Sequence, residues 1–230
     1  MQVPKQASTE DVLLMRLVRA IVAHDSSEAA NLLESSPSLA RQSLQVGATR
    51  QSAAEFFFEE IAHYLYAGDT PLHAAAAGYR LEIAKQLVVK GAYVGAANRR
   101  GAQPLHYAAD GGPGLPGWNR MVQAETITFL IESGADPNAV DDSGGAPIHR
   151  AVRQRCASAV EALLSSGAKV RLKNKNGSTP LHLAVQNTGK GGSGTPESKE
   201  LQRQIIKTLL KAGADPTTEM HTERPSGRAY

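Results

Sequence analysis

Thr70-Pro71-Leu72-His73 is the stretch that decides the fold, because a version of it returns three more times along the 230-residue chain. The other copies are Gln103-Pro104-Leu105-His106, Ala146-Pro147-Ile148-His149 and Thr179-Pro180-Leu181-His182. A threonine can cap a helix by accepting from an unpaired backbone amide, and proline suits the first helical turn. Each copy therefore predicts the start of a helix. Where Gln103 and Ala146 replace the capping threonine, the start is expected to be about 1 kcal/mol weaker.

Two glycine landmarks stay in register with these starts. One glycine stands two residues before each start, at Gly68, Gly101, Gly144 and Gly177. A Gly-Ala pair follows each start, at Gly91-Ala92, Gly134-Ala135, Gly167-Ala168 and Gly213-Ala214. Between them, apolar residues recur at helical spacing, as in Ile83, Leu87 and Val88. The pattern predicts pairs of helices, each pair ended by a glycine in a left-handed turn and joined to the next by a tight polar turn.

This pattern resembles the ankyrin repeat over residues from about 66 to 217. The resemblance implies an all-α solenoid of about five repeats, in which helix–turn–helix pairs alternate with β-hairpin finger turns. We expect a single domain over residues 1–230. Its expected parts are a degenerate N-terminal repeat at 8–46, a helical insertion at 47–65, a repeat at 66–98, a repeat with a loop insertion at 99–141, a repeat at 142–174, a second repeat with a loop insertion at 175–217, and a tail at 218–230. The interrupted form is also similar to bacterial ankyrin-repeat proteins, a looser likeness that indicates no partner.

The insertion at 47–65 gathers three of the four phenylalanines of the chain, Phe56, Phe57 and Phe58. We expect a helix from Ala53 to Tyr64 here. One interpretation is that these rings seal the first repeat against the second. The other is that some of them stay exposed as an apolar patch, which would mark a partner site or a surface for self-association.

The two loop insertions lie around Gly111 to Arg120 and Gly189 to Pro196, between the two helices of alternate repeats. They are expected to flank a basic middle repeat and to form a notch for an anionic group, an acidic peptide or a nucleotide-like small molecule. The candidate notch residues are Trp118, Arg120, Arg153, Arg155 and Lys190. The second loop lacks the residue order of a phosphate-binding loop. Solvated loops without a function are the alternative interpretation.

No pattern in the sequence indicates catalysis, a cofactor or a metal. The four repeated histidines occupy the same position of successive repeats, too far apart to share a metal ion. In the ankyrin family this histidine hydrogen-bonds to neighbouring backbone. Cys156 is the only cysteine, and Arg153 and Arg155 nearby could lower its pKa, but no general base stands beside it in sequence. We therefore expect no enzyme. With no apolar run long enough to span a membrane and no signal peptide, we expect a cytoplasmic protein.

The charges are distributed unevenly, although the net charge is only +3. Residues 1–70 carry five basic and nine acidic side chains, whereas residues 169–230 carry eleven and five. The resemblance implies protein binding on a concave surface of finger turns and inner helices. The residues expected there are Asn98, Arg99, Arg100, Tyr107, Asp110, Asp141, Asp142, Arg150, Arg153, Lys173, Lys175, Leu183 and Gln186. Because most of their charges are basic, we expect the partner to be an acidic protein or peptide, with Tyr107 as an aromatic anchor. We also expect a monomer, and the net charge is too small to argue for nucleic acid by itself.

Overall fold

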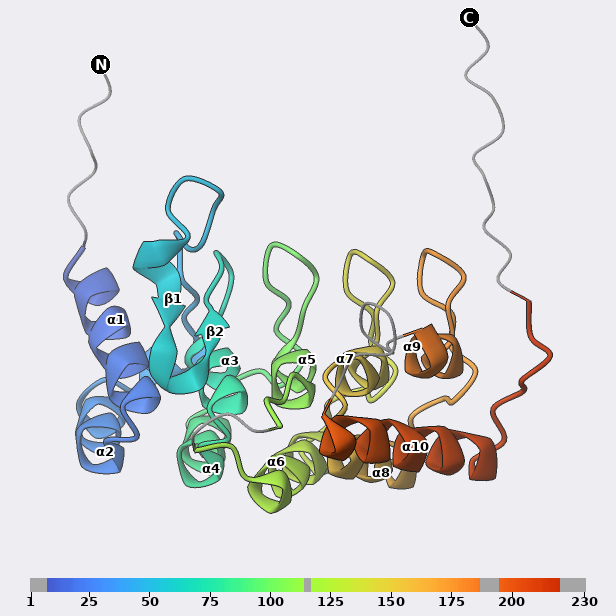
Figure 1. Ribbon diagram of the computed structural model, residues 1–230. Helices are drawn as coiled ribbons and strands as arrows, with labels where there is room; N and C mark the ends of the chain where they lie inside the picture. Colours follow the sequence, from blue (N-terminus) through green and yellow to red (C-terminus); the bar gives the residue numbers. More distant parts are fainter. Residues whose placement is uncertain (1–7, 114–116, 187–194, 220–230) are drawn as a thin grey trace, which may run out of the picture. The chain divides into compact units, whose positions relative to one another are not determined.

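The computed structural model describes residues 8–113, 117–186 and 195–219, and their regular secondary structure is almost entirely helical (Figure 1). They form two compact units, one of residues 1–108 with 129–135 and the other of residues 109–128 with 136–230. This confirms the predicted all-α class of paired helices. Helix α6 (Arg120–Glu132) contributes residues to both units, and α5 (Pro104–Ala109) belongs to the first unit except for its last residue.

The first unit opens with a helix pair that lacks the repeat motif. Helix α1 (Thr9–Val22) begins at a capping box, in which Ser8 Oγ accepts from the Asp11 N–H and the Asp11 carboxylate accepts from the Ser8 N–H. Helix α2 (Ser26–Ser35) begins after Asp25, whose carboxylate accepts from the Glu28 N–H. The Arg80 guanidinium donates to the Ile21 and Val22 carbonyls at the end of α1. The predicted helix pair near the N-terminus is therefore confirmed, and the hydrogen bonds from Arg80 join it to the next pair.

The first full repeat consists of α3 (Pro71–Ala77) and α4 (Leu81–Val89). All seven residues of α3 are buried, and five of them are small Ala or Pro side chains. In the second unit, α7 (Pro147–Arg153) is followed by α8 (Ala157–Ser165), and α9 (Pro180–Gln186) by α10 (Pro196–Lys211). The helices that carry the T-P-L-H motif or its variants are α3, α7 and α9, and each begins at its proline, as the sequence predicts.

The repeated histidine joins each helix start to the following finger turn. Its Nδ1 accepts from the backbone N–H three residues earlier, at distances from 3.0 to 3.1 Å in all four copies. Its Nε2 faces a carbonyl of the next turn: Ala102 for His73 at 3.1 Å, Ser178 for His149 at 3.2 Å and Thr218 for His182 at 2.8 Å. An imidazole that accepts at Nδ1 and donates at Nε2 is neutral. The structural role expected from the family is therefore confirmed at these three positions.

The finger turns form through one Asx side chain each. The Asp141 carboxylate accepts from the backbone N–H groups of Ser143 and Gly145 at 2.9 and 3.0 Å. Asn98 and Asn174 make the same two bonds in their own turns. Neighbouring turns of one unit also touch, since the Lys175 N–H donates to the Ser143 carbonyl at 3.1 Å. Gly144, at φ +72°, is required there, because a Cβ would lie 2.7 Å from the Lys175 nitrogen.

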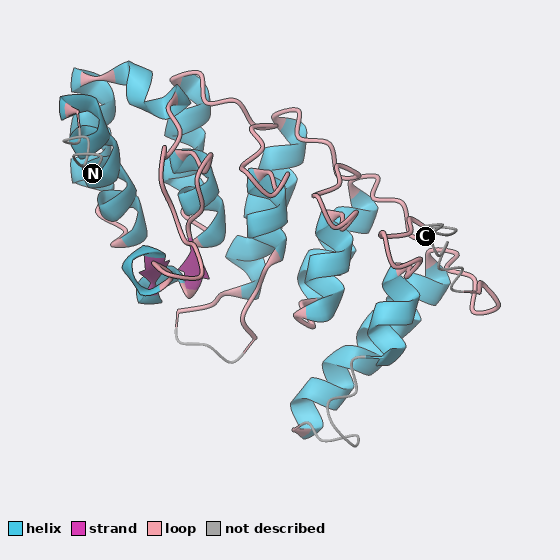
Figure 2. Cartoon of the chain, turned by 90° about the horizontal axis from the view of Figure 1, so that it is seen from above, coloured by secondary structure: helices cyan, strands magenta, loops and turns pink. Residues whose placement is uncertain are grey.

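The insertion corrects one prediction, because residues 53 to 64 form no α-helix. They form short 3-10 turns, Ala54–Phe56 and Glu59–Ile61, around a two-stranded hairpin of β1 (Phe57–Phe58) and β2 (His63–Tyr64), magenta in Figure 2. A helix would bond its own residues four apart, whereas here the backbone pairs across the insertion: the Leu65 N–H donates to the Phe56 carbonyl, and the Ala48 N–H to the Leu65 carbonyl. This pairing and the aromatic side chains of the strands favour a hairpin over a helix.

Pairing across the insertion continues to its ends, where the two chain segments approach closely. The Leu44 N–H donates to the Asp69 carbonyl at 2.8 Å, and the Gly68 N–H donates back to the Leu44 carbonyl at 2.7 Å. At Gly47, a Cβ would lie 2.3 Å from the carbonyl carbon of Tyr66. A glycine at this point is therefore what allows the insertion to fold back on itself.

Candidate binding surfaces

A buried carboxylate organises the middle of the first unit. Asp69 is fully buried, and it accepts hydrogen bonds from the Tyr107 hydroxyl at 2.7 Å, the Asn98 side-chain amide at 2.8 Å and the Tyr66 N–H at 2.6 Å. A buried charge is tolerated only when it is hydrogen-bonded in this way. Tyr107 is 1% exposed and Asn98 is also buried. The prediction that Tyr107 is an aromatic anchor for a partner is therefore wrong, and Asn98 is a turn residue rather than a binding residue.

The β1–β2 hairpin covers this cluster with one face and is exposed on the other. The His63 ring lies 4.2 Å from the Tyr107 ring, and the His73 ring meets Tyr107 edge-on at 5.0 Å. Across the hairpin, Phe57 pairs with Tyr64, and their rings lie 4.7 Å apart with 38% and 39% of the residues exposed. Alternation along the strands thus places His63 inward and the Phe57–Tyr64 pair outward.

Arg150 occupies in its repeat the position that Tyr107 occupies in another, directly after the histidine. Its guanidinium contacts the Asp110 carboxylate at 2.7 Å and the Asp141 carboxylate at 2.9 Å, and all three side chains are less than 20% exposed. Burial acts to raise the pKa of Asp141, but hydrogen bonds from Ser143 and Arg150 outweigh it and leave that pKa well below its usual value. Because the three side chains pair with one another, they offer few free groups, and their contact with a partner stays a prediction.

The remaining predicted binding residues are exposed, apart from the half-buried Leu183. They are Arg99, Arg100, Asp142, Arg153, Lys173, Lys175 and Gln186. In the first unit, the Arg99 and Arg100 guanidinium carbons lie 5.5 and 4.9 Å from the centre of the Tyr66 ring, and Arg99 also donates to the Ala48 carbonyl. Cation–π contacts of this kind hold exposed arginines in place. In the second unit, Lys173 Nζ donates to the Glu219 carbonyl at 3.2 Å.

Cys156 does not have the low pKa that neighbouring arginines could give it. Burial raises the pKa of its thiol to about 12, so that it remains protonated at neutral pH. Within residues 8–113, 117–186 and 195–219, no three His, Cys, Asp or Glu side chains come together in a way that could hold a metal ion. Among the described helices, none combines the length and the apolar character that a membrane crossing requires.

Comparison with known families agrees with this architecture. Residues 67–99 match the model of the ankyrin repeat, and residues 119–220 match a model of ankyrin repeats in three copies. The chain belongs to the ankyrin-repeat family. No curated protein matches its sequence. Ankyrin repeats are generally protein–protein interaction modules, and proteins built from them are typically scaffolds without enzymatic activity.

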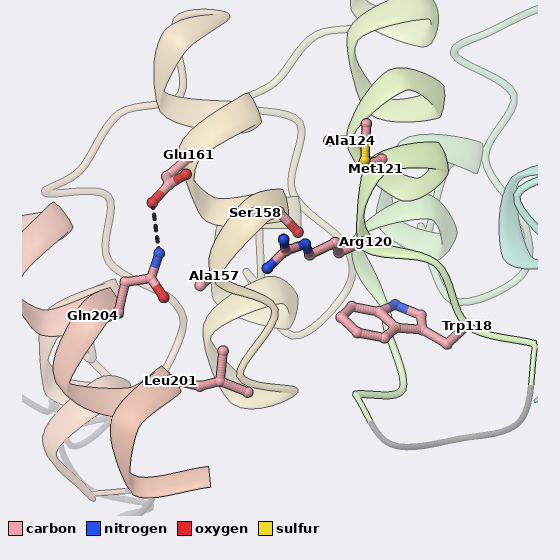
Figure 3. A pocket seen from close by; sticks show the side chains of 9 residues that line it. All are labelled: Trp118, Arg120, Met121, Ala124, Ala157, Ser158, Glu161, Leu201 and Gln204. Atoms are coloured by element: carbon pink, nitrogen blue, oxygen red, sulfur yellow. Dashed lines mark hydrogen bonds between the residues drawn. The ribbon is translucent and has the colours of Figure 1, made fainter. Parts of the chain in front are cut away.

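The candidate notch of this ankyrin-repeat protein is only partly as predicted. Trp118 and Arg120 line a pocket of about 220 Å³ in the second unit (Figure 3). Arg153 and Arg155 do not line it, and Lys190 lies outside the described residues. Arg153 is the last residue of α7, and Arg155 lies in the following turn at φ +58°. Both residues therefore come before Ala157 and Ser158, where this repeat begins to line the pocket. The other lining residues are Met121, Ala124, Ala157, Ser158, Glu161, Leu201 and Gln204.

Sequence reasoning missed Asp69, Ser158 and Leu201. One signal for the first was available, because Asp69 stands directly before a T-P-L-H start where the other copies have Ala102, Gly145 and Ser178. An acidic side chain at a position otherwise held by small residues needs a dedicated partner. Ser158 and Leu201 carried no comparable signal, since each is an ordinary helical residue whose role depends on which helices meet.

Proposed function

We propose that this ankyrin-repeat protein is a monomeric, non-enzymatic scaffold that binds an acidic protein or peptide through its finger turns. The observation that carries the proposal is the pair of stacked arginines at the finger turn of the first unit. Arg99 and Arg100 both lie over the Tyr66 ring, and neither forms an ion pair with a carboxylate of another described residue. Two guanidinium groups held on one ring offer a fixed array of donors for a partner carboxylate.

The second unit supports the same proposal with lysines. Lys173 and Lys175 lie exposed on its finger turn, and Lys175 has no ion pair within the described part of the chain. The nearby acidic residues Asp110 and Asp141 are already ion-paired with Arg150. The charge that remains available to a partner on this surface is therefore mainly positive, which favours an acidic ligand and accelerates its association.

Self-association through the phenylalanine-rich insertion finds less support. Of the three phenylalanines only Phe57 is exposed, and its ring lies against that of Tyr64. A stable interface buries roughly 800 Å² per partner, far more than two half-exposed rings supply. We therefore propose that the hairpin contributes to the edge of a larger interface.

A charge-reversal variant tests the finger surface. Random peptides would be selected on the immobilised protein, and binding of the selected peptides to the variant Arg99→Glu, Arg100→Glu, Lys175→Glu would then be measured. We expect Asp and Glu to be enriched among the peptides, and association with the variant to slow about tenfold or more at low salt. The matched control is Arg19→Glu, Lys207→Glu, Lys211→Glu, which changes the net charge equally at exposed helical positions. Equal loss in both variants, or none in the first, would rule out a specific finger surface.

A further inference from the structure

A second surface with defined chemistry lies on the outer helices of the second unit. The pocket of Figure 3 is lined by residues from α6, α8 and α10, together with Trp118 just before α6. None of its lining residues belongs to a finger turn or to the inner helices α7 and α9. A ligand bound here would therefore leave the finger surface of the same unit free.

One wall of the pocket is apolar and held in place. The Trp118 indole N–H donates to the side-chain oxygen of Gln123 at 3.0 Å, and Gln123 is fully buried. Gln123 packs in turn beside Gly111, where a Cβ would lie 2.1 Å from the Cys156 sulfur and 2.7 Å from the Gln123 amide nitrogen. Gly111 is thus packed tightly against Gln123, the residue that holds the indole ring. Trp118 offers a prearranged aromatic surface, which lowers the entropic cost of binding.

Two more apolar side chains continue this wall. Met121 on α6 is 64% exposed, and Leu201 on α10 contributes from the other side of the pocket. A tryptophan, a methionine and a leucine around one depression are the residue types that receive an apolar side chain at protein interfaces. The exposure of Met121 in the unliganded chain means that a bound side chain would gain contact area by covering it.

The polar groups of the pocket differ between its two sides. Glu161 already accepts a hydrogen bond from the Gln204 amide at 3.1 Å. Arg120 is exposed and forms no ion pair with any other described residue. Beside it, the Ser158 hydroxyl oxygen is buried and has no hydrogen-bond partner within the described residues. A guanidinium and a hydroxyl donor next to an apolar wall call for an acceptor with negative charge.

We propose that this pocket is a second docking site, which receives a segment of a partner polypeptide carrying a large apolar side chain next to a carboxylate. The apolar side chain packs against Trp118, Met121 and Leu201, and the carboxylate accepts from the exposed guanidinium of Arg120. The volume of about 220 Å³ is below the roughly 300–1,000 Å³ of sites for small molecules. It suits one or two side chains of a peptide that continues over the surface.

The pocket carries its own reporter, because Trp118 is the only tryptophan of the chain. Capped hexapeptides without tryptophan or tyrosine would be titrated up to millimolar concentration, each with one Glu next to Leu, Ile, Met or Phe. A second set carries Gln in place of Glu, and a third set carries Lys. We expect a saturable change in Trp118 fluorescence with members of the Glu set, and at least tenfold weaker affinity for their Gln and Lys counterparts.

Two variants separate the pocket from general electrostatics. Arg120→Gln is expected to weaken binding of the Glu peptides about tenfold, whereas Lys207→Gln on the exposed side of α10 leaves it unchanged. Circular dichroism confirms that both variants fold. A response that is equal in wild type and Arg120→Gln, no response to any Glu peptide, or a response to a small aromatic carboxylate alone would overturn the proposal. So would a fluorescence change that follows protein concentration without peptide, which indicates self-association. The finger variant Arg99→Glu, Arg100→Glu, Lys175→Glu should bind these peptides normally, so that the two proposals succeed or fail separately.

Discussion

Replacing Tyr107 with phenylalanine isolates the contribution of the buried cluster around Asp69. The substitution removes one oxygen atom and keeps the ring that packs against His63 and His73. The Asp69 carboxylate then loses the donor at 2.7 Å but keeps the Asn98 amide and the Tyr66 N–H. A hydrogen bond to a charged group contributes about 1.5–3 kcal/mol, and two of the three donors remain. We therefore expect Tyr107→Phe to lower the free energy of unfolding by about 2 kcal/mol.

Urea denaturation followed by circular dichroism measures this change, with Tyr93→Phe as the matched control. Tyr93 is 71% exposed, and its loss of a hydroxyl should alter stability by less than about 0.5 kcal/mol. A double-mutant cycle with Asp69→Asn then tests the pairing, because the two substitutions should cost less together than the sum of their single effects. Since repeat proteins can unfold in steps, amide hydrogen exchange in α3 and α5 locates the change.

The reasoning is refuted if Tyr107→Phe and Tyr93→Phe have the same small effect, or if the double-mutant cycle shows no coupling. Either result would mean that the Asp69 charge is stabilised by its backbone and Asn98 contacts alone. In that case Tyr107 would serve only to fill space.

Two further substitutions test the second unit. Arg150→Met leaves the carboxylates of Asp110 and Asp141 without their cation, so we expect the free energy of unfolding measured in urea to fall by about 3 kcal/mol. Adding Asp110→Asn should restore part of this loss. Full stability of the single variant would contradict the ion-pair assignment. His149 tests the neutral imidazole, because burial lowers its pKa below 6.5. Its contribution to the free energy of unfolding is therefore complete above pH 6.5 and is lost as the pH falls below that value. Between pH 7.5 and 5.5 the wild type should therefore lose more stability than His149→Gln, and parallel pH profiles would show that this histidine is not linked to folding.

The sequence predicts the repeat fold well because its signals are local. Thr70 and Pro71 start a helix through bonds within one turn, and the finger turn places Gly144 at a positive φ of +72°, which favours glycine. Both constraints act over a few residues, so they are visible in the order of residue types. The role of the histidine is implied by the family resemblance, and its Nδ1 contact, made to the residue three positions earlier, is local as well.

The binding residues could not be predicted equally well, because exposure depends on contacts between repeats. Tyr107 lies in the inner helix, where the family resemblance leads us to expect binding residues, yet its hydroxyl donates to the buried carboxylate of Asp69, 38 residues earlier. Arg150 is turned inward by Asp110, 40 residues earlier. The hairpin fold of the insertion likewise depends on long-range pairing between Ala48 and Leu65. No pattern within a single repeat encodes these pairings.

Tyr107 and Arg150 lead to a more general conclusion about how the repeats of this chain are joined. Both residues follow the histidine of their repeat, and both join that repeat to the one before it, by hydrogen bonds in one unit and by ion pairs in the other. Each link uses an acidic residue that is not part of the common repeat pattern, Asp69 or Asp110. At these two positions the inner helices therefore serve to join repeats. We propose accordingly that partners bind at the finger turns around Arg99 and at the outer helices around Trp118, two surfaces that single sets of substitutions can inactivate separately.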